Sequence, residues 1–442
     1  MLFSDRDLKR LVVPLLLEQT LVVLIGMADT VMVAFCGETV VSGVSLVDSF
    51  NTLLRLVLSA LSTGGAVVSS QYLGKQDRQN AGIAAKMLFY AVLVISMLMM
   101  ILCLSLNSPI LSLMFGAIEP DVMEAAQVYF LMTALSYPFL GMYNASCALL
   151  RSMGNAKATL KTSIVMNLIN ICGNALTIYV LGWGVFGAGL ATLLSHIVGA
   201  VMTQQMLRRS SNVIPYPQML HFEWNSSIVG KILRVGVPGG LENGIFQLGK
   251  LVLVRMVATF GTVHIAANAV CNSISTFHCL PGNAIGLAMI TVVGQCVGAR
   301  EFQQARHYTK KLMLLTYACM STLNVILLLI TPWMVSMFNL SEEAARLAVI
   351  CVCIHGTGCI FLWPMGFTFP NALRAAGDAK YTMIVSAFSM VAFRVVFGLV
   401  FGMVLGWGVI GVWSAMNLDW IFRIIMFVVR YRSGKWESKV LV

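Results

Sequence analysis

Residues 150–157 read Leu-Arg-Ser-Met-Gly-Asn-Ala-Lys, and residues 373–380 read Leu-Arg-Ala-Ala-Gly-Asp-Ala-Lys. When a single-residue gap is allowed, these two segments align at the same offset of 224 residues that relates other segments of the chain. Three such pairs are 10–18 with 234–242 (Arg-x-x-x-Pro-x-x-x-Glu), 71–74 with 295–298 (Gln-x-x-Gly) and 181–185 with 405–409 (Leu-Gly-Trp-Gly-Val). Chance similarity between apolar helices would not keep one offset through polar and glycine positions. The chain is therefore an internal duplication.

The composition is that of a membrane protein. Of the 442 residues, 58% are hydrophobic and 11% are charged, whereas soluble globular proteins carry roughly 25% charged residues. This excludes a soluble multi-domain enzyme, a disordered chain and a secreted disulfide scaffold. The eleven cysteines show no metal-ligand spacing and are interpreted as buried, inert thiols.

Apolar segments long enough to cross a bilayer, about 20 residues each, recur twelve times. They are expected near residues 8–34, 43–72, 82–106, 122–148, 159–181, 185–208, 229–259, 264–297, 307–330, 343–371, 382–404 and 408–431. We therefore predict an all-α polytopic membrane protein with twelve transmembrane helices in two six-helix lobes. The expected domains are an N-lobe at 1–210, a cytoplasmic linker at 211–228 and a C-lobe at 229–442.

Charge sets the expected orientation. The chain has 29 Lys and Arg against 18 Asp and Glu, a net charge of +11. The cations gather at both termini and in the loops after even-numbered spans, which predicts that both termini are cytoplasmic in the inner cell membrane. Cations dispersed in this way argue against a nucleic-acid partner. Because the repeat already supplies both lobes, a monomer is expected.

Several motifs resemble those of the multidrug and toxic compound extrusion (MATE) family. They are, in order, Pro14 followed by Gly-Met-Ala-Asp-Thr at 26–30, Gln-Tyr-Leu-Gly at 71–74 and Arg-Ser-Met-Gly at 151–154. The resemblance implies a V-shaped pair of lobes and antiport of organic, often cationic, compounds against Na⁺ or H⁺. Parallel six-helix repeats fit transporters that rock two lobes about a central cavity. The chain has no Walker A motif, so no cofactor is expected and an ion or substrate gradient must supply the energy.

Asp29 is the first candidate site residue. An ionisable group inside a membrane helix costs about 2.5–3.5 kcal/mol on insertion scales, so it requires a reason. This carboxylate is interpreted as a group that binds a cation or takes up a proton. The alternative is a permanent structural pair with a cation such as Arg55.

Asn170 and Asn174 are spaced i, i+4 and share a helix face, and Thr192 lies in the next span. The resemblance implies that these three residues complete a cation or proton site around Asp29, with Na⁺ as the candidate metal ion. Some relatives carry an acid at the position of Asn174, so the choice between Na⁺ and H⁺ stays open. The alternative role for the two amides is hydrogen bonding between helices.

The repeat offers a comparison with the second lobe. The residues that follow the four predicted site residues by 224 positions have no carboxylate, amide or hydroxyl side chain. They are Leu253, Arg394, Gly398 and Met416. The hypothesis is therefore that ion coupling belongs to the first lobe.

Pro14 and Pro238 stand one turn before Glu18 and Glu242 in equivalent spans. Each proline leaves a backbone carbonyl without its intrahelical partner, which predicts a bend in both helices.

Glu18 and Glu242 are candidates for the substrate cleft, where their carboxylates would attract a cationic compound. The alternative is structural pairing, for Glu242 with Lys250 or Arg394.

Two other pairs of charges share a helix face. Asp48 and Arg55, seven residues apart, are interpreted either as an ion pair or as residues that gate the substrate cleft. Asp419 and Arg423, four residues apart, are expected to be interhelical or snorkelling partners.

Two other functions fit the sequence less well. A flippase for lipid-linked precursors would need several cations around a pyrophosphate headgroup, and the first lobe offers mainly Arg55. An integral-membrane enzyme would need clustered catalytic groups, such as H-x-x-x-H or paired Asp motifs, and the sequence has none.

Overall fold

The computed structural model describes residues 2–116, 119–209, 212–216 and 223–442, and every regular element within these ranges is a helix. Helices are the expected result, because a span surrounded by lipid must satisfy its backbone hydrogen bonds internally. The chain forms two compact units, Ser4–Gly240 and Leu241–Val442, and residues 1–3 are grouped with the second.

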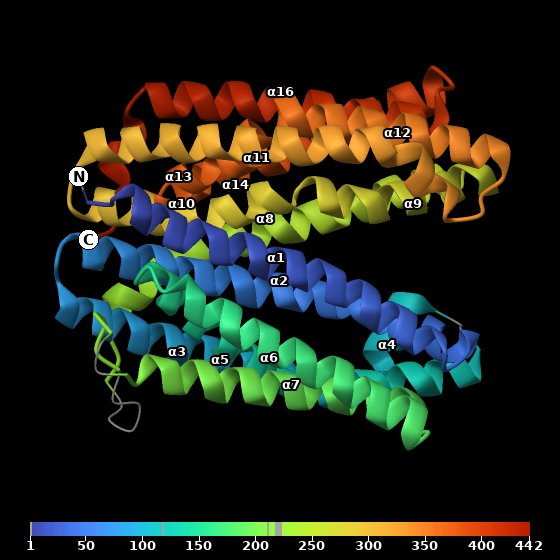
Figure 1. Cartoon of the computed structure of the whole chain (residues 1–442), viewed down its shortest axis with the longest axis horizontal. Coiled ribbons are helices and arrows are strands. Elements are labelled where there is room, and N and C mark those ends of the chain that lie inside the picture. The colour runs from blue at the N-terminus through green and yellow to red at the C-terminus, as the bar shows by residue number, and fades with distance from the viewer. Residues whose placement is uncertain (1, 117–118, 210–211, 217–222) are drawn as a thin grey trace. The chain divides into compact units, whose positions relative to one another are not determined.

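The first unit contains seven α-helices, one π-helical turn and the beginning of an eighth α-helix (Figure 1). Its elements are α1 (Asp5–Ala34), α2 (Glu38–Gly74), α3 (Arg78–Ser105), α4 (Asn107–Phe115), α5 (Pro120–Ser152), α6 (Ala156–Asn174), η1 (Ala175–Val180), α7 (Gly184–Leu207) and the start of α8 (Ser226–Ala258). Helix α5 packs against α2, α3 and α7, while α1 packs along α6. Buried Val47, Phe130 and Ala134 belong to the core of this unit.

The second unit begins at Leu241, inside α8. Its further elements are α9 (Thr262–His278), α10 (Leu280–Gly298), α11 (Phe302–Ser336), α12 (Glu342–Phe361), η2 (Pro364–Thr368), α13 (Pro370–Ala375), α14 (Ala379–Ser389), η3 (Met390–Val395), α15 (Val396–Leu399), η4 (Val400–Val404), α16 (Gly408–Arg432) and η5 (Lys435–Lys439). The start of the chain joins this unit, because the Tyr308 hydroxyl donates to the Phe3 carbonyl at 2.6 Å. The contact boundary thus falls within α8. The linker predicted at 211–228 includes 211 and 217–222, which lie outside the described residues, and it stays a prediction.

The predicted architecture of two six-helix halves is confirmed. Ten helical segments among the described residues are long and apolar enough to span a membrane. Helices α5 and α8 have sufficient length but a less apolar composition, and they complete two sets of six. Helices α1 and α8 continue through Pro14 and Pro238, which lie inside them.

A π-helical turn closes the fifth span of each half, as η1 in one and η4 in the other. The hydrogen bonds after these turns are equivalent under the 224-residue offset. Trp183 N–H donates to Thr177 O at 2.9 Å, and Trp407 N–H donates to Phe401 O at 3.1 Å. The duplication therefore extends to backbone geometry.

The Leu-Gly-Trp-Gly turn explains why glycine occurs twice in each copy. Gly182 and Gly184 have φ of 65° and 51°, and Gly406 and Gly408 have φ of 70° and 56°. These are left-handed conformations that residues with a Cβ adopt at a cost, whereas glycine adopts them readily.

Candidate functional site

The residues of the predicted ion site lie together in the first unit. Packing of α1 along α6 places Asp29 beside the amide face of α6. Asn174 Nδ2 donates to Asp29 Oδ1 at 3.0 Å. The Asn170 amide satisfies its hydrogen bonds when its nitrogen faces Asp29, and it then donates to Oδ2 at 3.0 Å and Oδ1 at 2.6 Å. The other amide atom of Asn170 lies 3.4 Å from the Thr192 hydroxyl.

This cluster contains oxygen atoms suited to a small cation. Asp29 is half-buried and has no ion-pair partner within 4 Å in the described ranges. The side-chain oxygen of Asn174 is buried and accepts no hydrogen bond from a described residue. Carboxylate, amide and hydroxyl oxygens are the ligands that hard cations prefer, and an amide presents either its oxygen or its nitrogen after rotation.

Asp48 and Arg55 lie on α2 near this cluster. Asp48 is within electrostatic range of Asp29 and accepts a long hydrogen bond of 3.4 Å from the Tyr129 hydroxyl. Arg55 donates to Thr52 Oγ1 at 3.0 Å. Arg55 lies within electrostatic range of Asp48, but among the described residues it forms no ion pair within 4 Å with Asp48 or Asp29. The roles predicted for these residues stay predictions.

Glu18 and Glu242 have equivalent partners in the two halves. Glu18 lies 3.6 Å from Arg151 and accepts a 2.6 Å hydrogen bond from Thr159. Glu242 lies 2.7 Å from Arg374. The structural alternative that paired Glu242 with Lys250 or Arg394 was wrong about the partner.

Both arginines belong to the Leu-Arg-x-x-Gly-x-Ala-Lys repeat, so each ion pair joins two repeated motifs. Sequence reasoning found the motifs but missed their pairing. The retention of both the acid and the arginine in both copies was the available signal.

The positions of the second unit that are equivalent to the ion site also lie near one another, but they carry different side chains. A Cβ built on Gly398 would lie 3.3 Å from Leu253 Cδ2, so this glycine approaches a leucine where Asn174 approaches Asp29. Arg394, the equivalent of Asn170, lies 3.8 Å from Asp419. Asp419 and Arg423, four residues apart on α16, form an ion pair of 2.8 Å within that helix.

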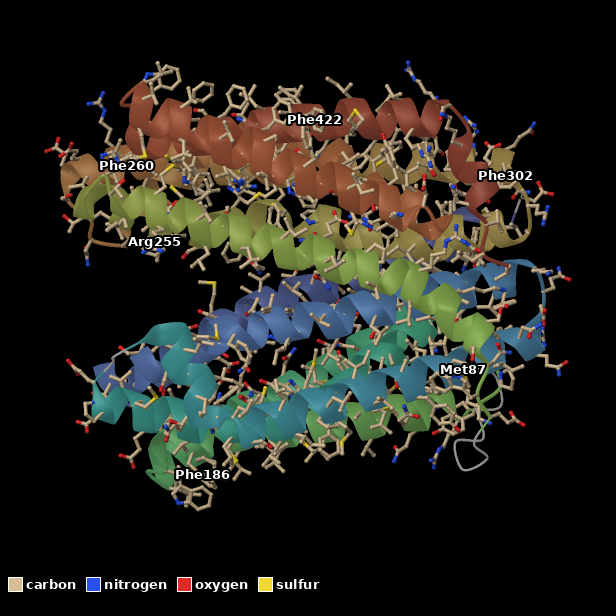
Figure 2. The ribbon with its side chains drawn as sticks, turned by 180° about the vertical axis from the view of Figure 1, so that it is seen from behind. Met87, Phe186, Arg255, Phe260, Phe302 and Phe422 are labelled. Atoms are coloured by element: carbon tan, nitrogen blue, oxygen red, sulfur yellow. The ribbon has the colours of Figure 1, made fainter. Side chains whose placement is uncertain are left out.

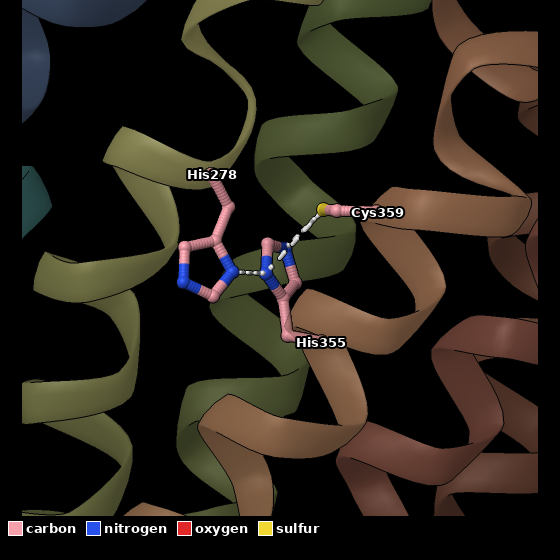
Figure 3. A group of neighbouring side chains, drawn as sticks. All are labelled: His278, His355 and Cys359. Carbon is pink, nitrogen blue, oxygen red and sulfur yellow. Dashed lines mark hydrogen bonds between the residues drawn. The ribbon is translucent and has the colours of Figure 1, made fainter. Parts of the chain in front are cut away.

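A separate cluster of imidazole and thiol groups lies between α9 and α12 (Figure 3). His278 Nδ1 and His355 Nδ1 are 3.0 Å apart, and Cys359 Sγ lies 3.6 Å from the same His355 nitrogen. Such a short distance between ring nitrogens requires one to donate and the other to accept. The pair therefore links the two helices by a hydrogen bond between side chains that are 0% and 5% exposed.

Comparison with known proteins agrees with this duplicated fold. A sequence profile of the MatE family matches residues 14–176 and again 238–400, two segments with the 224-residue offset. The uncharacterized transporter YisQ of Bacillus subtilis is 26% identical over 96% of this chain and 94% of its own length. The probable multidrug resistance protein NorM of Thermotoga maritima is 25% identical, covering 99% and 94%. Human multidrug and toxin extrusion protein 1 is 23% identical, covering 96% and 74%.

Solved structures share the fold. A crystal structure of MATE in the bent conformation superposes with a TM-score of 0.90 at 19% identity, covering 98% of this chain and 96% of that one. A MOP superfamily transporter from Pyrococcus furiosus, whose reverse polarity of the binding pocket is described as suggesting a different function, gives 0.91 at 20% identity with the same coverage. The chain thus belongs to the MatE family of multi-pass membrane transporters, a family of multidrug exporters.

Proposed function

We propose that this protein is a secondary antiporter that exports organic cationic or amphiphilic compounds in exchange for Na⁺ or H⁺. It acts in the cytoplasmic membrane as a monomer, with both termini in the cytoplasm and no catalytic role. Transport follows from rocking of the two lobes, because an ion that binds two conformations unequally shifts their populations.

The observation that carries this proposal is the half-buried Asp29 carboxylate held by two amides and without an ion pair within the described ranges. A carboxylate without a fixed counter-charge is able to exchange a cation or a proton. Asn170, Asn174 and Thr192 supply the neighbouring polar atoms, and the buried Asn174 oxygen is a further ligand for Na⁺. Coupling is assigned to the first lobe, since the equivalent positions in the second lobe carry no carboxylate.

The test is efflux of a fluorescent organic cation, such as ethidium, from proteoliposomes under an imposed Na⁺ or pH gradient. The native protein should respond to one of the two gradients, and Asp29→Asn should lose that response. Asp121→Asn is the matched control, because Asp121 is an exposed acid in the first turn of α5. Efflux with unchanged ion dependence in Asp29→Asn would remove this carboxylate from the coupling mechanism.

A further inference from the structure

A cavity of about 140 Å³ lies within the second unit, between α8, α9, η3 and α16. Its lining includes Lys250, Leu253, Asn268, Arg394, Trp413 and Met416. We call it the Arg394 pocket. The lining residues are basic, neutral polar or apolar, so the pocket presents positive charge.

Positive charge exceeds negative charge around the pocket. Asp419 is the acid that faces Arg394, at 3.8 Å, but its carboxylate already lies 2.8 Å from Arg423. The Lys250 ammonium makes no ion pair among the described residues and lies 5.2 Å from the Phe246 ring centroid. Arg394 and Arg423 thus share one carboxylate, and Lys250 adds a further positive charge. Uncompensated cations in a membrane span are costly, which makes them candidates for binding an anion.

Unused donors accompany this charge. The Arg394 Nε–H is buried and has no acceptor in the part of the chain that the structure describes. Asn268 Oδ1 accepts from Trp413 Nε1 at 3.0 Å, which fixes the amide with its nitrogen as the remaining donor. A guanidinium, an ammonium and an amide nitrogen form a donor set suited to a carboxylate.

The size and walls of the pocket narrow the class of ligand. A cavity of roughly 150 Å³ admits benzene in another protein. Leu253 and Met416 supply apolar walls, and the Trp413 ring supplies an aromatic one. We propose that the Arg394 pocket binds a small aromatic carboxylate, either as a separate compound or as the anionic end of a zwitterion.

This site is distinct from the proposed ion site, because all its lining residues follow Leu241. It also extends the ligand class beyond the organic cations proposed above. Its test measures binding without transport, so it is independent of the ion-coupling hypothesis.

The experiment is isothermal titration of the full-length protein in lipid nanodiscs with benzoate, benzamide and inorganic phosphate. Benzoate should bind with a saturable signal, and neutral benzamide should bind at least about tenfold more weakly, since charge-assisted hydrogen bonds are lost. Equal binding of benzoate and benzamide, or no benzoate binding, would overturn the proposal. Tighter binding of phosphate than of benzoate would overturn the assignment to a carboxylate.

Variants locate the site. Lys250→Gln should weaken benzoate binding about tenfold, and because Lys250 makes no ion pair in the described structure its removal should not disturb folding. Arg394→Gln should weaken binding at least as much, and Arg394→Lys should retain part of it. Arg255→Gln is the matched control, because Arg255 is an exposed cation on α8 outside the pocket (Figure 2). Unchanged affinity in Lys250→Gln and Arg394→Gln, or an equal loss in Arg255→Gln, would contradict binding at this pocket.

Discussion

Arg374 Nη2 lies 2.7 Å from Glu242 Oε1, and this ion pair joins two motifs that the chain carries twice. The equivalent pair, Arg151 with Glu18, occurs in the other half at 3.6 Å. Their recurrence indicates that the pair holds the first and fourth spans of each half together, α1 with α5 in one and α8 with α13 in the other.

Removing one charge of this pair should destabilise the folded protein more than removing both charges. Glu242→Gln leaves the Arg374 guanidinium without its counter-charge, at a side-chain exposure of only 19%. We expect a loss of about 3 kcal/mol in the free energy of unfolding. The double variant Glu242→Gln/Arg374→Gln should lose less, because neither charge is then unpaired. Chemical denaturation in detergent, analysed as a double-mutant cycle, checks this. Additive losses would show that the two charges do not depend on one another.

Asn174 should matter to ion coupling more than to folding. Asn174→Ala removes the hydrogen bond to Asp29 and the buried side-chain oxygen. We expect the Na⁺ concentration for half-maximal efflux to rise about tenfold, the effect of losing one polar ligand to a charged group. The measurement is efflux at a series of Na⁺ concentrations. Asn167→Ala is the matched control, because Asn167 lies on the same helix and donates to Ser163. Equal changes in the two variants would contradict a specific role for Asn174.

Two glycines of the second Leu-Gly-Trp-Gly turn should differ in their tolerance of alanine. At Gly406 the obstacle is the left-handed φ of 70°, since a Cβ there would meet no other described residue within 4 Å apart from its chain neighbours. Gly406→Ala should cost about 1 kcal/mol of stability. Gly408→Ala should cost more, because its Cβ would also meet the His264 ring. In thermal unfolding, the Tm of Gly408→Ala should be lower than the Tm of Gly406→Ala. Gly230→Ala, in a helix with open space around it, is the control and should be neutral or stabilising.

The loop between α2 and α3 should give a pH-dependent contribution to stability. Asp77 caps α3 by accepting from the Asn80 backbone N–H at 3.0 Å and from its side-chain Nδ2 at 2.6 Å. The Asn80 hydrogen bonds lower the pKa of Asp77 below its ordinary value of 3.8. The stabilisation is therefore fully present above pH 3.8 and is lost as the pH falls through the lower folded-state pKa.

Asp77→Ala should cost about 1 kcal/mol at neutral pH through loss of the cap. The difference from the native protein should shrink as the solution is acidified through the folded-state pKa. Unfolding measured across an acid pH series checks the trend, and a difference that is constant down to the lowest pH would contradict it. Asp77→Asn keeps the capping oxygen without its charge and should be intermediate.

Much of the fold was predictable from the sequence, because bilayer thickness and backbone hydrogen bonding leave few alternatives for long apolar segments. The i, i+4 spacing of Asn170 and Asn174 also predicted their common face correctly. The partner of Glu242 was not predictable in this way. Periodicity gives the face of a helix on which a charge lies, but it does not give the helix that packs against that face.

The sequence by itself determined the duplication, the order of the spans and the contrast between Asp29 in one half and Leu253 in the other. Tertiary structure alone decided which groups meet: the amides on Asp29, Arg374 on Glu242, and the cations around the Arg394 pocket. The physical reason is that spacing along one helix is fixed by its geometry, whereas contacts between helices depend on their packing and rotation. In the Arg394 pocket, Lys250 and Arg394 are 144 positions apart in the sequence and become neighbours only through that packing.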